Sequence, residues 1–332
     1  MRIKATAFAF LAASVSAMAD VKINDHFTFN GYAVASYGRY ELKPIGGFSD
    51  NAQTALLGTS FDFKPVSGKV SAVYFNGEGE EHKLSLLDAY ATVQTANGFS
   101  VTAGNFLSYM GYESFHPTNR DQITRPDNVF QRTYHTGARI DYAGVTSSSG
   151  LAIVDSIDSP NGPFRGDGEI KHNVGFEYFY SYTGIKNVTL WAGVAHETAN
   201  DFINKKSVTF FDFWASYKVN AKVRVAAEYV HKGGGSFAAY SWLTFLNYSL
   251  SEKVSCTFRI SGSKLNFNFN TLTDTIGTRS SSSFGPTTTY TISPSYNITK
   301  NVTIRAQYSH TNIPSRYYYI DNYYGVQTIF KF

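Results

Sequence analysis

One segment of the chain concentrates charges of both signs between two strands that the sequence predicts. Residues 108–130 carry carboxylates, guanidinium groups and one imidazole, at Glu113, His116, Arg120, Asp121, Arg125 and Asp127. Acidic and basic side chains that face one another across an opening create a transverse field, and rings of charged side chains select solutes by sign. If this segment folds inward, its acidic and basic side chains would set such a field and select among solutes. The alternative is an exposed loop whose charges are solvated.

A second set of charges occurs singly, in the middle of apolar alternating stretches. Arg259 and Arg305 both have apolar residues on either side. An arginine that faces hydrocarbon at mid-height costs about 2–4 kcal/mol, so both side chains require a wet interior. The alternation places the following residues on that same wet face: Asp88, His135, Arg139, Asp141, Glu177, Arg224, Glu228, Arg259 and Arg305. In an alternative interpretation these charges pair with one another and only stiffen the wall.

The sequence does not fit an enzyme or a metal protein. His135 and Asp141 share a strand face but lie about 20 Å apart at roughly 3.4 Å per residue, too far for the acid to orient the imidazole. Motifs of the G-x-S-x-G and H-E-x-x-H types are absent from the sequence. Cys256 is the only cysteine, which excludes an internal disulfide and a cysteine-based metal site. We expect no catalytic residue, no cofactor and no metal.

The N-terminus has the pattern of a cleaved secretory signal. Arg2 and Lys4 precede an apolar stretch, and Ala17-Met18-Ala19 predicts cleavage between Ala19 and Asp20. The apolar stretch is too short to span a bilayer. We expect residues 1–19 to be removed and 20–332 to form one domain. Loss of two basic residues lowers the net charge from +4 to +2, and no basic stripe suggests a nucleic-acid partner.

Alternating apolar and polar residues identify the elements that must position these charges. Residues 223–231 and 302–310 alternate as a strand with one dry and one wet face does. The 24 Tyr and 27 Phe also favour strands. The pattern predicts sixteen strands, at 27–40, 54–63, 67–76, 83–95, 99–107, 131–143, 150–158, 171–183, 187–198, 207–218, 222–231, 236–250, 253–264, 286–298, 301–311 and 321–332.

The connections between these strands alternate between short and long. Short turns lie near Pro65, Asn97, Ser147, Ile185, Asn220, Ser251 and Thr299. Long links are expected at 41–53, 77–82, 108–130, 159–170, 199–206, 232–235, 265–285 and 312–320. Short turns on one rim and long loops on the other are typical of transmembrane barrels. A soluble sandwich has the same alternation within strands, so the connections decide between the two.

The last residues predict how the sheet closes. Phe332, Phe330, Thr328, Val326 and Tyr324 fall on one face of the final strand, and mostly polar residues fall on the other, with Ile329 the exception. Unpaired backbone groups cost several kcal/mol each in hydrocarbon, so an open edge is excluded. The last strand must therefore pair with the first, and we interpret Phe332 as the terminal assembly signal.

Short motifs between residues 87 and 142 add a family resemblance. They are Leu87-Asp88-Ala89-Tyr90, Val101-Thr102-Ala103-Gly104, Gly111-Tyr112-Glu113 and Tyr134-His135-Thr136-Gly137. In this order they resemble the second family of bacterial outer-membrane β-barrel porins. The resemblance implies a barrel used as a porin, but it does not imply a particular solute.

We therefore predict an all-β protein, a transmembrane antiparallel up-and-down β-barrel of about sixteen strands, with 14 or 18 as alternatives. It would lie in the outer membrane, with short periplasmic turns and long outer loops. The predicted function is passive diffusion of small hydrophilic solutes or ions; the alternative is a structural or surface-binding barrel that does not conduct. The expected partners are the lipid bilayer, the barrel-assembly machinery, small hydrophilic solutes and, as is common for pores of this size, two further copies in a homo-trimer.

Overall fold

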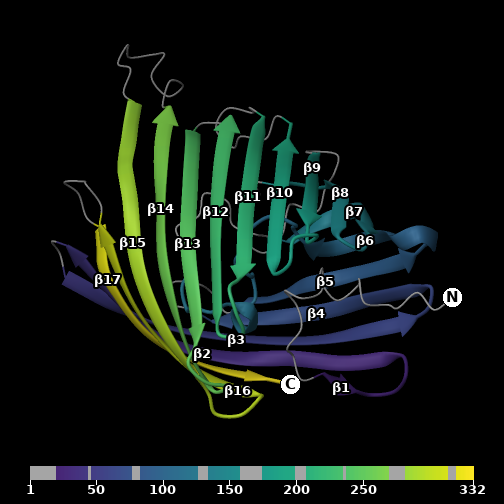
Figure 1. Cartoon of the computed structure of the whole chain (residues 1–332), viewed down its shortest axis with the longest axis horizontal. Coiled ribbons are helices and arrows are strands. Elements are labelled where there is room, and N and C mark those ends of the chain that lie inside the picture. The colour runs from purple at the N-terminus through teal and green to yellow at the C-terminus, as the bar shows by residue number, and fades with distance from the viewer. Residues whose placement is uncertain are drawn as a thin grey trace.

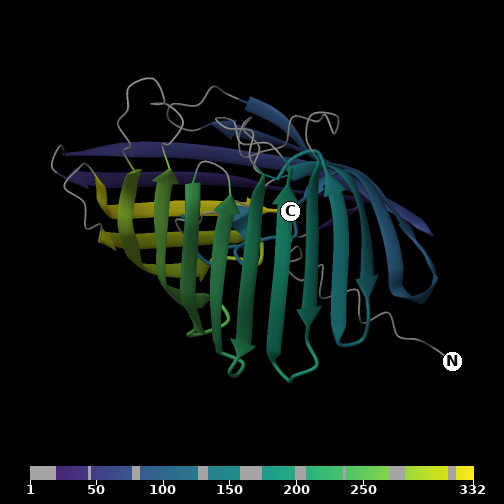
Figure 2. The same cartoon turned by 90° about the horizontal axis from the view of Figure 1, so that it is seen from above.

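The fold is one antiparallel sheet that curves round and closes on itself (Figures 1 and 2). The computed structural model describes residues 20–43, 46–76, 83–125, 134–157, 174–198, 207–234, 237–268, 281–312 and 319–332. The predicted signal segment 1–19 lies outside these residues, and Asp20 is exposed. Every predicted strand has a counterpart, so the prediction of sixteen strands in a barrel is confirmed.

Sixteen strands, β2 to β17, make the ring, and the two-residue β1 (Val21–Lys22) pairs with the start of β2. Each strand is hydrogen-bonded to its neighbours in the sequence, and β17 pairs with β2. The bounds are β2 (Phe27–Lys43), β3 (Gly46–Phe63), β4 (Val66–Asn76), β5 (Lys83–Gln94), β6 (Phe99–Leu107), β7 (Tyr134–Ala143), β8 (Ser147–Val154), β9 (Gly175–Tyr182), β10 (Val188–Glu197), β11 (Val208–Lys218), β12 (Val223–Gly234), β13 (Phe237–Ser249), β14 (Val254–Asn268), β15 (Ser281–Asn297), β16 (Val302–Asn312) and β17 (Tyr319–Lys331). Two short 3₁₀ turns are η2 (Ala96–Gly98) and η3 (Pro117–Asn119).

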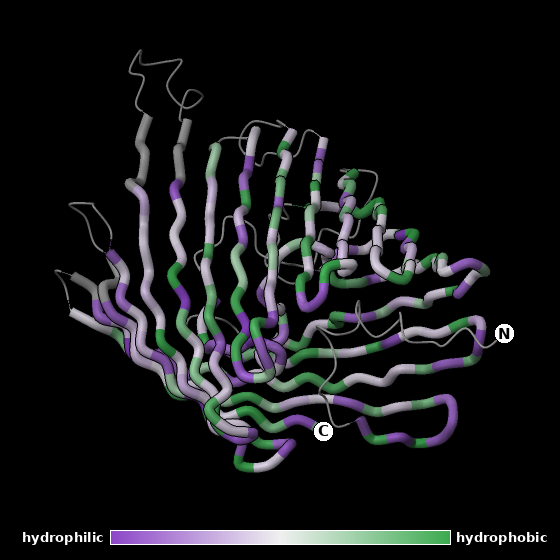
Figure 3. The backbone as a smooth tube through the Cα atoms, in the orientation of Figure 1, coloured by the Kyte–Doolittle hydropathy of each residue, from purple (hydrophilic) through white to green (hydrophobic). Residues whose placement is uncertain are grey.

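Alternation along each strand separates an outer apolar face from an inner one. On β9, Phe176 and Tyr178 are exposed on the outside, whereas Glu177 and Phe179 are buried inside. Hydrophilic and hydrophobic segments accordingly succeed one another along single strands in Figure 3. The outer face carries exposed aromatic side chains, such as Tyr308 and Phe330.

The predicted connections are correct on the short side and partly wrong on the long side. The turns between β3 and β4 and between β7 and β8 are short, as expected. The predicted link 41–53 is wrong, because β2 continues to Lys43 and β3 begins at Gly46. The weak link 232–235 is likewise almost all strand. The prediction was wrong because polar side chains were interpreted as loop residues. Strand pairing forms the backbone hydrogen bonds whichever side chains point into water.

The loop 265–285 is also shorter than predicted. The strand β14 extends to Asn268 and pairs with the start of β15 at Ser281. The alternation at 266–269 thus did indicate a strand extension. The predicted links 77–82, 159–170 and 199–206 lie wholly outside the residues that the structure describes. Among the described residues, no helix has the length and apolarity needed to cross a membrane.

Phe332 lies at the seam where the ring closes. Its amide donates to the carbonyl of Gly31 at 3.0 Å, and the amide of Gly31 donates back to Phe332 at 2.9 Å. The ring of Phe332 packs on Phe29 and Phe330, with centroids 5.6 and 5.7 Å apart. A Cβ at position 31 would lie 2.4 Å from the carbonyl oxygen of Leu56 and 2.8 Å from the ring of Phe332.

Gly31→Val should therefore destabilise the seam. The added side chain must displace backbone on one side and the terminal ring on the other, so the temperature at which the folded band converts to the unfolded band on a gel should fall. Ala35→Val, which adds a larger side chain on the exposed outer face of the same strand, is the control. Equal thermal midpoints for the two variants would contradict the role assigned to Gly31.

Candidate functional site

The segment 108–125 leaves β6 and lies inside the barrel. Its amides and side chains contact strands on widely separated parts of the ring. The amide of Tyr112 donates to Glu228 on β12 at 2.5 Å, and the amide of Ile123 donates to Gln307 on β16 at 2.7 Å. His116 lies 3.2 Å from the hydroxyl of Tyr32 on β2. A loop this short can reach all three strands only from inside the ring, so residues 108–125 lie within the barrel. We call residues 108–125 the inner loop.

Two glycines and a proline shape the inner loop. Gly104 and Gly111 have positive φ values of 126° and 95°, a region that favours glycine. A Cβ at Gly104 would lie 2.1 Å from the carbonyl oxygen of Ala89, so glycine also permits close approach of β5. Pro117 opens the short turn η3, where a missing amide proton costs nothing.

Carboxylates on the wall hold the first half of the inner loop. Glu177 on β9 accepts the hydroxyl of Ser108 at 2.5 Å and the amide of Tyr109 at 3.1 Å. Asp212 on β11 accepts the amide of Gly111 at 2.6 Å, and Glu228 accepts the next amide. Hydrogen bonds to an ionised acceptor are roughly twice as strong as neutral ones. The acids of β9, β11 and β12 therefore satisfy a backbone that has no regular structure of its own.

Side chains of β14 and β16 hold the second half. Arg259 on β14 donates to the carbonyl of Thr124 at 3.0 Å, and Arg305 on β16 donates to the carbonyl of Gln122 at 3.2 Å. The amide oxygen of Gln307 accepts from Ile123 and Thr124. Acids thus bind loop N–H groups on one side and arginines bind loop C=O groups on the other.

Apolar packing completes the attachment. Phe115 is buried with Tyr134, Leu87 and Ile329 in one cluster, which explains why Ile329 breaks the polar pattern of its strand face. On the other side, the rings of Phe179, Trp191 and Trp214 stack across β9 to β11 at 6.0 and 5.8 Å. The inner wall is therefore partly apolar wherever the inner loop covers it.

His116 is the buried centre of the loop. Its two ring nitrogens lie 3.2 Å from the hydroxyl of Tyr32 and 3.1 Å from that of Tyr134. Burial is the main reason that the pKa of His116 falls to about 3. The positive charges of Lys69, Arg125 and Arg120 lower the pKa further, and the negative charge of Asp88 opposes them. At neutral pH the imidazole is uncharged, with one nitrogen donating and the other accepting.

The residues predicted to line the lumen all have inner-face partners, and most of these lie on the loop or beside it. Asp88 pairs with Lys69 at 2.8 Å and Arg139 pairs with Asp141 at 3.2 Å. Asp141 accepts the hydroxyl of Tyr109, and His135 lies 3.4 Å from Glu177. Arg224 pairs with Asp121, and Arg259 pairs with Glu113 at 3.0 Å. Of the six predicted loop residues, Asp127 lies outside the described residues.

Sequence reasoning missed several residues that hold the loop. Asp212 lies between Phe211 and Phe213, so the rule that found Arg259 would have found it too. Gln307 and the stacked aromatic residues carried no comparable signal, because neutral or apolar side chains do not reveal what they face. In the part of the chain that the structure describes, no group of three or more histidine, cysteine, aspartate or glutamate residues could hold a metal ion.

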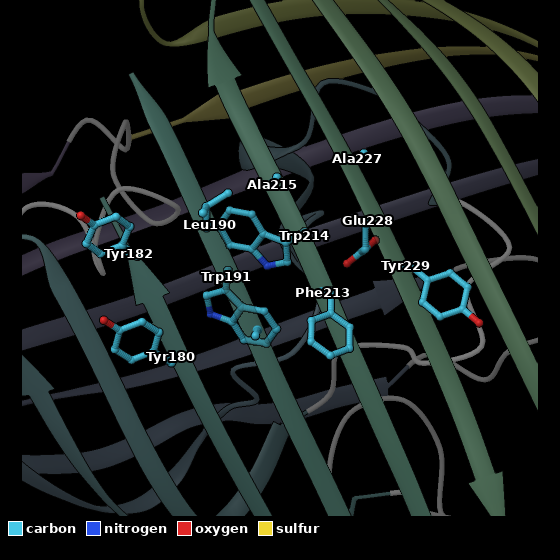
Figure 4. Close-up of a pocket in the computed structure, with 11 residues that line it drawn as sticks. Tyr180, Tyr182, Leu190, Trp191, Phe213, Trp214, Ala215, Ala227, Glu228 and Tyr229 are labelled. Atoms are coloured by element: carbon cyan, nitrogen blue, oxygen red, sulfur yellow. The ribbon is translucent and has the colours of Figure 1, made fainter. Parts of the chain in front are cut away.

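A shallow groove of about 650 Å³ lies on the wall of strands β9 to β12 (Figure 4). Most of the residues that line the groove face outward, among them the small Ala192, Ala215 and Ala227. Trp191 and Trp214 face inward and also line it. The sides are Tyr180, Tyr182, Leu190, Phe213 and Tyr229. This groove faces the outside of the barrel and is separate from the lumen.

Comparison with known proteins supplies the family. The model of the family described as "Putative beta-barrel porin-2, OmpL-like" matches residues 51–331. The chain belongs to this porin family. The resemblance drawn from the motifs at Gly111 and His135 is confirmed. The porin is thus an outer-membrane channel for passive diffusion, with its barrel spanning the outer membrane.

Solved structures agree with this porin in fold. OprB of Pseudomonas putida, at high pH, is 10% identical, with 92% of this chain and 94% of that chain covered and a TM-score of 0.67. The outer membrane channel DcaP of Acinetobacter baumannii is 12% identical, with 95% and 100% covered and a TM-score of 0.64. OmpT of Vibrio cholerae, in a trimer form, is 10% identical, with 93% and 100% covered and a TM-score of 0.62. No curated protein sequence matches the chain.

Asp212→Ala should loosen the inner loop of the porin. The substitution removes the charged acceptor of the Gly111 amide. A hydrogen bond to a charged group stabilises by about 1.5–3 kcal/mol. Hydrogen exchange at residues 109–113 should become faster, and the open-channel current should become noisier. Glu252→Ala, in an exposed turn, is the control and should change neither. Unchanged exchange in Asp212→Ala would show that the loop does not depend on this contact.

Acid pH should also weaken loop docking, through His116. A released imidazole has a pKa near 6.5, whereas the docked pKa is about 3. The contribution of the neutral imidazole is therefore fully present above about pH 6.5 and is lost as pH falls towards 3. At pH 5 the loss is about 2 kcal/mol. Loop exchange should accelerate over this range in the wild type, and a His116→Gln variant with the same pH slope would refute the assignment.

Proposed function

We propose that small hydrophilic solutes and ions diffuse through the lumen past the inner loop, that this loop sets the width and charge of the passage, and that the chain catalyses no reaction. The inner loop carries the proposal, because it crosses a barrel that at sixteen strands would otherwise enclose a wide aqueous channel. The Arg224–Asp121 pair supports a wet passage, since its side chains keep 44% and 34% of their exposure.

We also propose that the porin works as a homo-trimer assembled by the barrel-assembly machinery. The trimer form of OmpT, which has the same fold, supports the first part. Phe332 supports the second, because it ends the closing strand and its backbone pairs with Gly31. Cross-linking of the detergent-folded protein would give a trimer band if the first part is correct, and monomers at every protein concentration would contradict it.

Planar-bilayer recording tests conduction directly. The purified, detergent-folded porin should give stepwise single-channel currents, and liposomes that contain it should swell in small sugars. The absence of both steps and swelling would refute the channel.

A cysteine at the loop tests the position of the passage. In a Cys256→Ser background, Asp121→Cys should lose conductance when a bulky charged thiol reagent is added, because the side chain lies beside the path. Lys222→Cys, in an exposed turn, is the matched control and should keep its conductance after labelling. Full conductance in the labelled Asp121→Cys channel would place the solute path elsewhere.

A further inference from the structure

Arg120, on the inner loop, has no counter-ion among the residues that the structure describes. Its Nη1 donates to the carbonyl of Ile123 at 3.0 Å, and its Nε is buried without a hydrogen-bond partner. Among the described residues no carboxylate lies within ion-pair distance of this guanidinium. The Nε–Nη2 edge of an arginine is the fork that binds carboxylates and phosphates with two parallel hydrogen bonds. On Arg120 this edge is the one left unused.

Arg305 contacts the backbone of Arg120, and among the described residues it too has no carboxylate partner. Its Nη2 donates to the backbone carbonyl of Arg120 at 2.6 Å, and its other donors reach Ser295, Gln327 and Gln122. All four partners are neutral oxygens. Arg305 is 5% exposed, so its charge has little contact with water.

The two carboxylates near Arg120 on the inner loop already form ion pairs with other arginines. Glu113 and Asp121 thus pair with Arg259 and Arg224, whereas Arg120 and Arg305 have no carboxylate within ion-pair distance among the described residues. The carboxylates of β9, β11 and β12 lie at the first half of the loop, where they accept hydrogen bonds from backbone amides.

Enclosed cations without partners are unfavourable, because they have lost hydration and gained no ion pair. An anion from solution can restore the balance, and arginine is the side chain that binds oxyanions through a planar fork. We propose that Arg120, backed by Arg305, forms an anion-binding site beside the solute path, which makes the porin anion-selective and favours solutes that carry a carboxylate or a phosphate. This inference rests on the proposed function, since it names the class of solute that the same passage takes.

Reversal potentials in a potassium chloride gradient test the sign of selectivity. The wild type should be anion-selective, Arg120→Gln should shift the potential towards cations, and Lys222→Gln, in an exposed turn, should match the wild type. Channels that are unselective or cation-selective in the wild type would overturn the anion site while leaving the proposed function intact. Absence of any channel in the wild type would instead overturn the proposed function.

Inorganic phosphate tests the site itself. Millimolar phosphate should reduce the chloride current of the wild type, and Arg120→Gln should weaken this block roughly tenfold. Arg120→Lys keeps the charge without the fork, so it should keep anion selectivity and lose part of the phosphate block. A block of equal strength in wild type and Arg120→Lys would contradict the fork, and a block of equal strength in all three proteins would place phosphate elsewhere. If Arg120→Gln does not fold, judged by heat-modifiable migration, Arg120→Lys and the wild-type potential decide.

Discussion

The whole structure depends on the rule that no backbone hydrogen-bonding group can remain unpaired in hydrocarbon. A sheet in a bilayer can meet it only by closing, and here β17 closes on β2 through a ladder that ends at Phe332. Closure makes two different surfaces of one sheet. The outer face meets lipid and is apolar, whereas the inner face is free to carry charges. The charged strand residues that contact the inner loop lie on the inner face for that reason.

The inner charges do not simply line a water-filled pore. Most of them hold the inner loop, whose irregular backbone would otherwise lack partners inside the barrel. Glu177, Asp212 and Glu228 accept its N–H groups, while Arg259 and Arg305 donate to its C=O groups. The expected alternative, in which wall charges stiffen the barrel, is therefore partly realised, but through the loop rather than mainly through one another. The charges that can act on a solute are those that are not already paired with the inner loop or with one another.

This arrangement divides the lumen electrically. Carboxylates on β9, β11 and β12 accept hydrogen bonds from loop amides, and Arg259 on β14 and Arg305 on β16 donate to loop carbonyls. Because each nearby acid already has a cation, the excess charge is positive at the loop and not spread over the lumen. A net charge close to zero for the whole chain therefore says little about the field at its narrowest part.

The sequence alone determined the strands, their number, the closing role of Phe332 and the inward direction of residues such as Arg259 and Arg305. These features depend on a period of two along the chain and on the cost of a charge in lipid, which are both local. Outer strand ends were predicted less well. The polar residues at 41–53 show no alternation of apolar and polar side chains that would distinguish a hairpin from a loop. Only the tertiary structure decided which charges meet. Gly111 and Asp212 are 101 residues apart in sequence, and Arg305 reaches a carbonyl 183 positions away on the inner loop. Such pairs are set by which strands face each other across the closed ring, and no local pattern records that geometry.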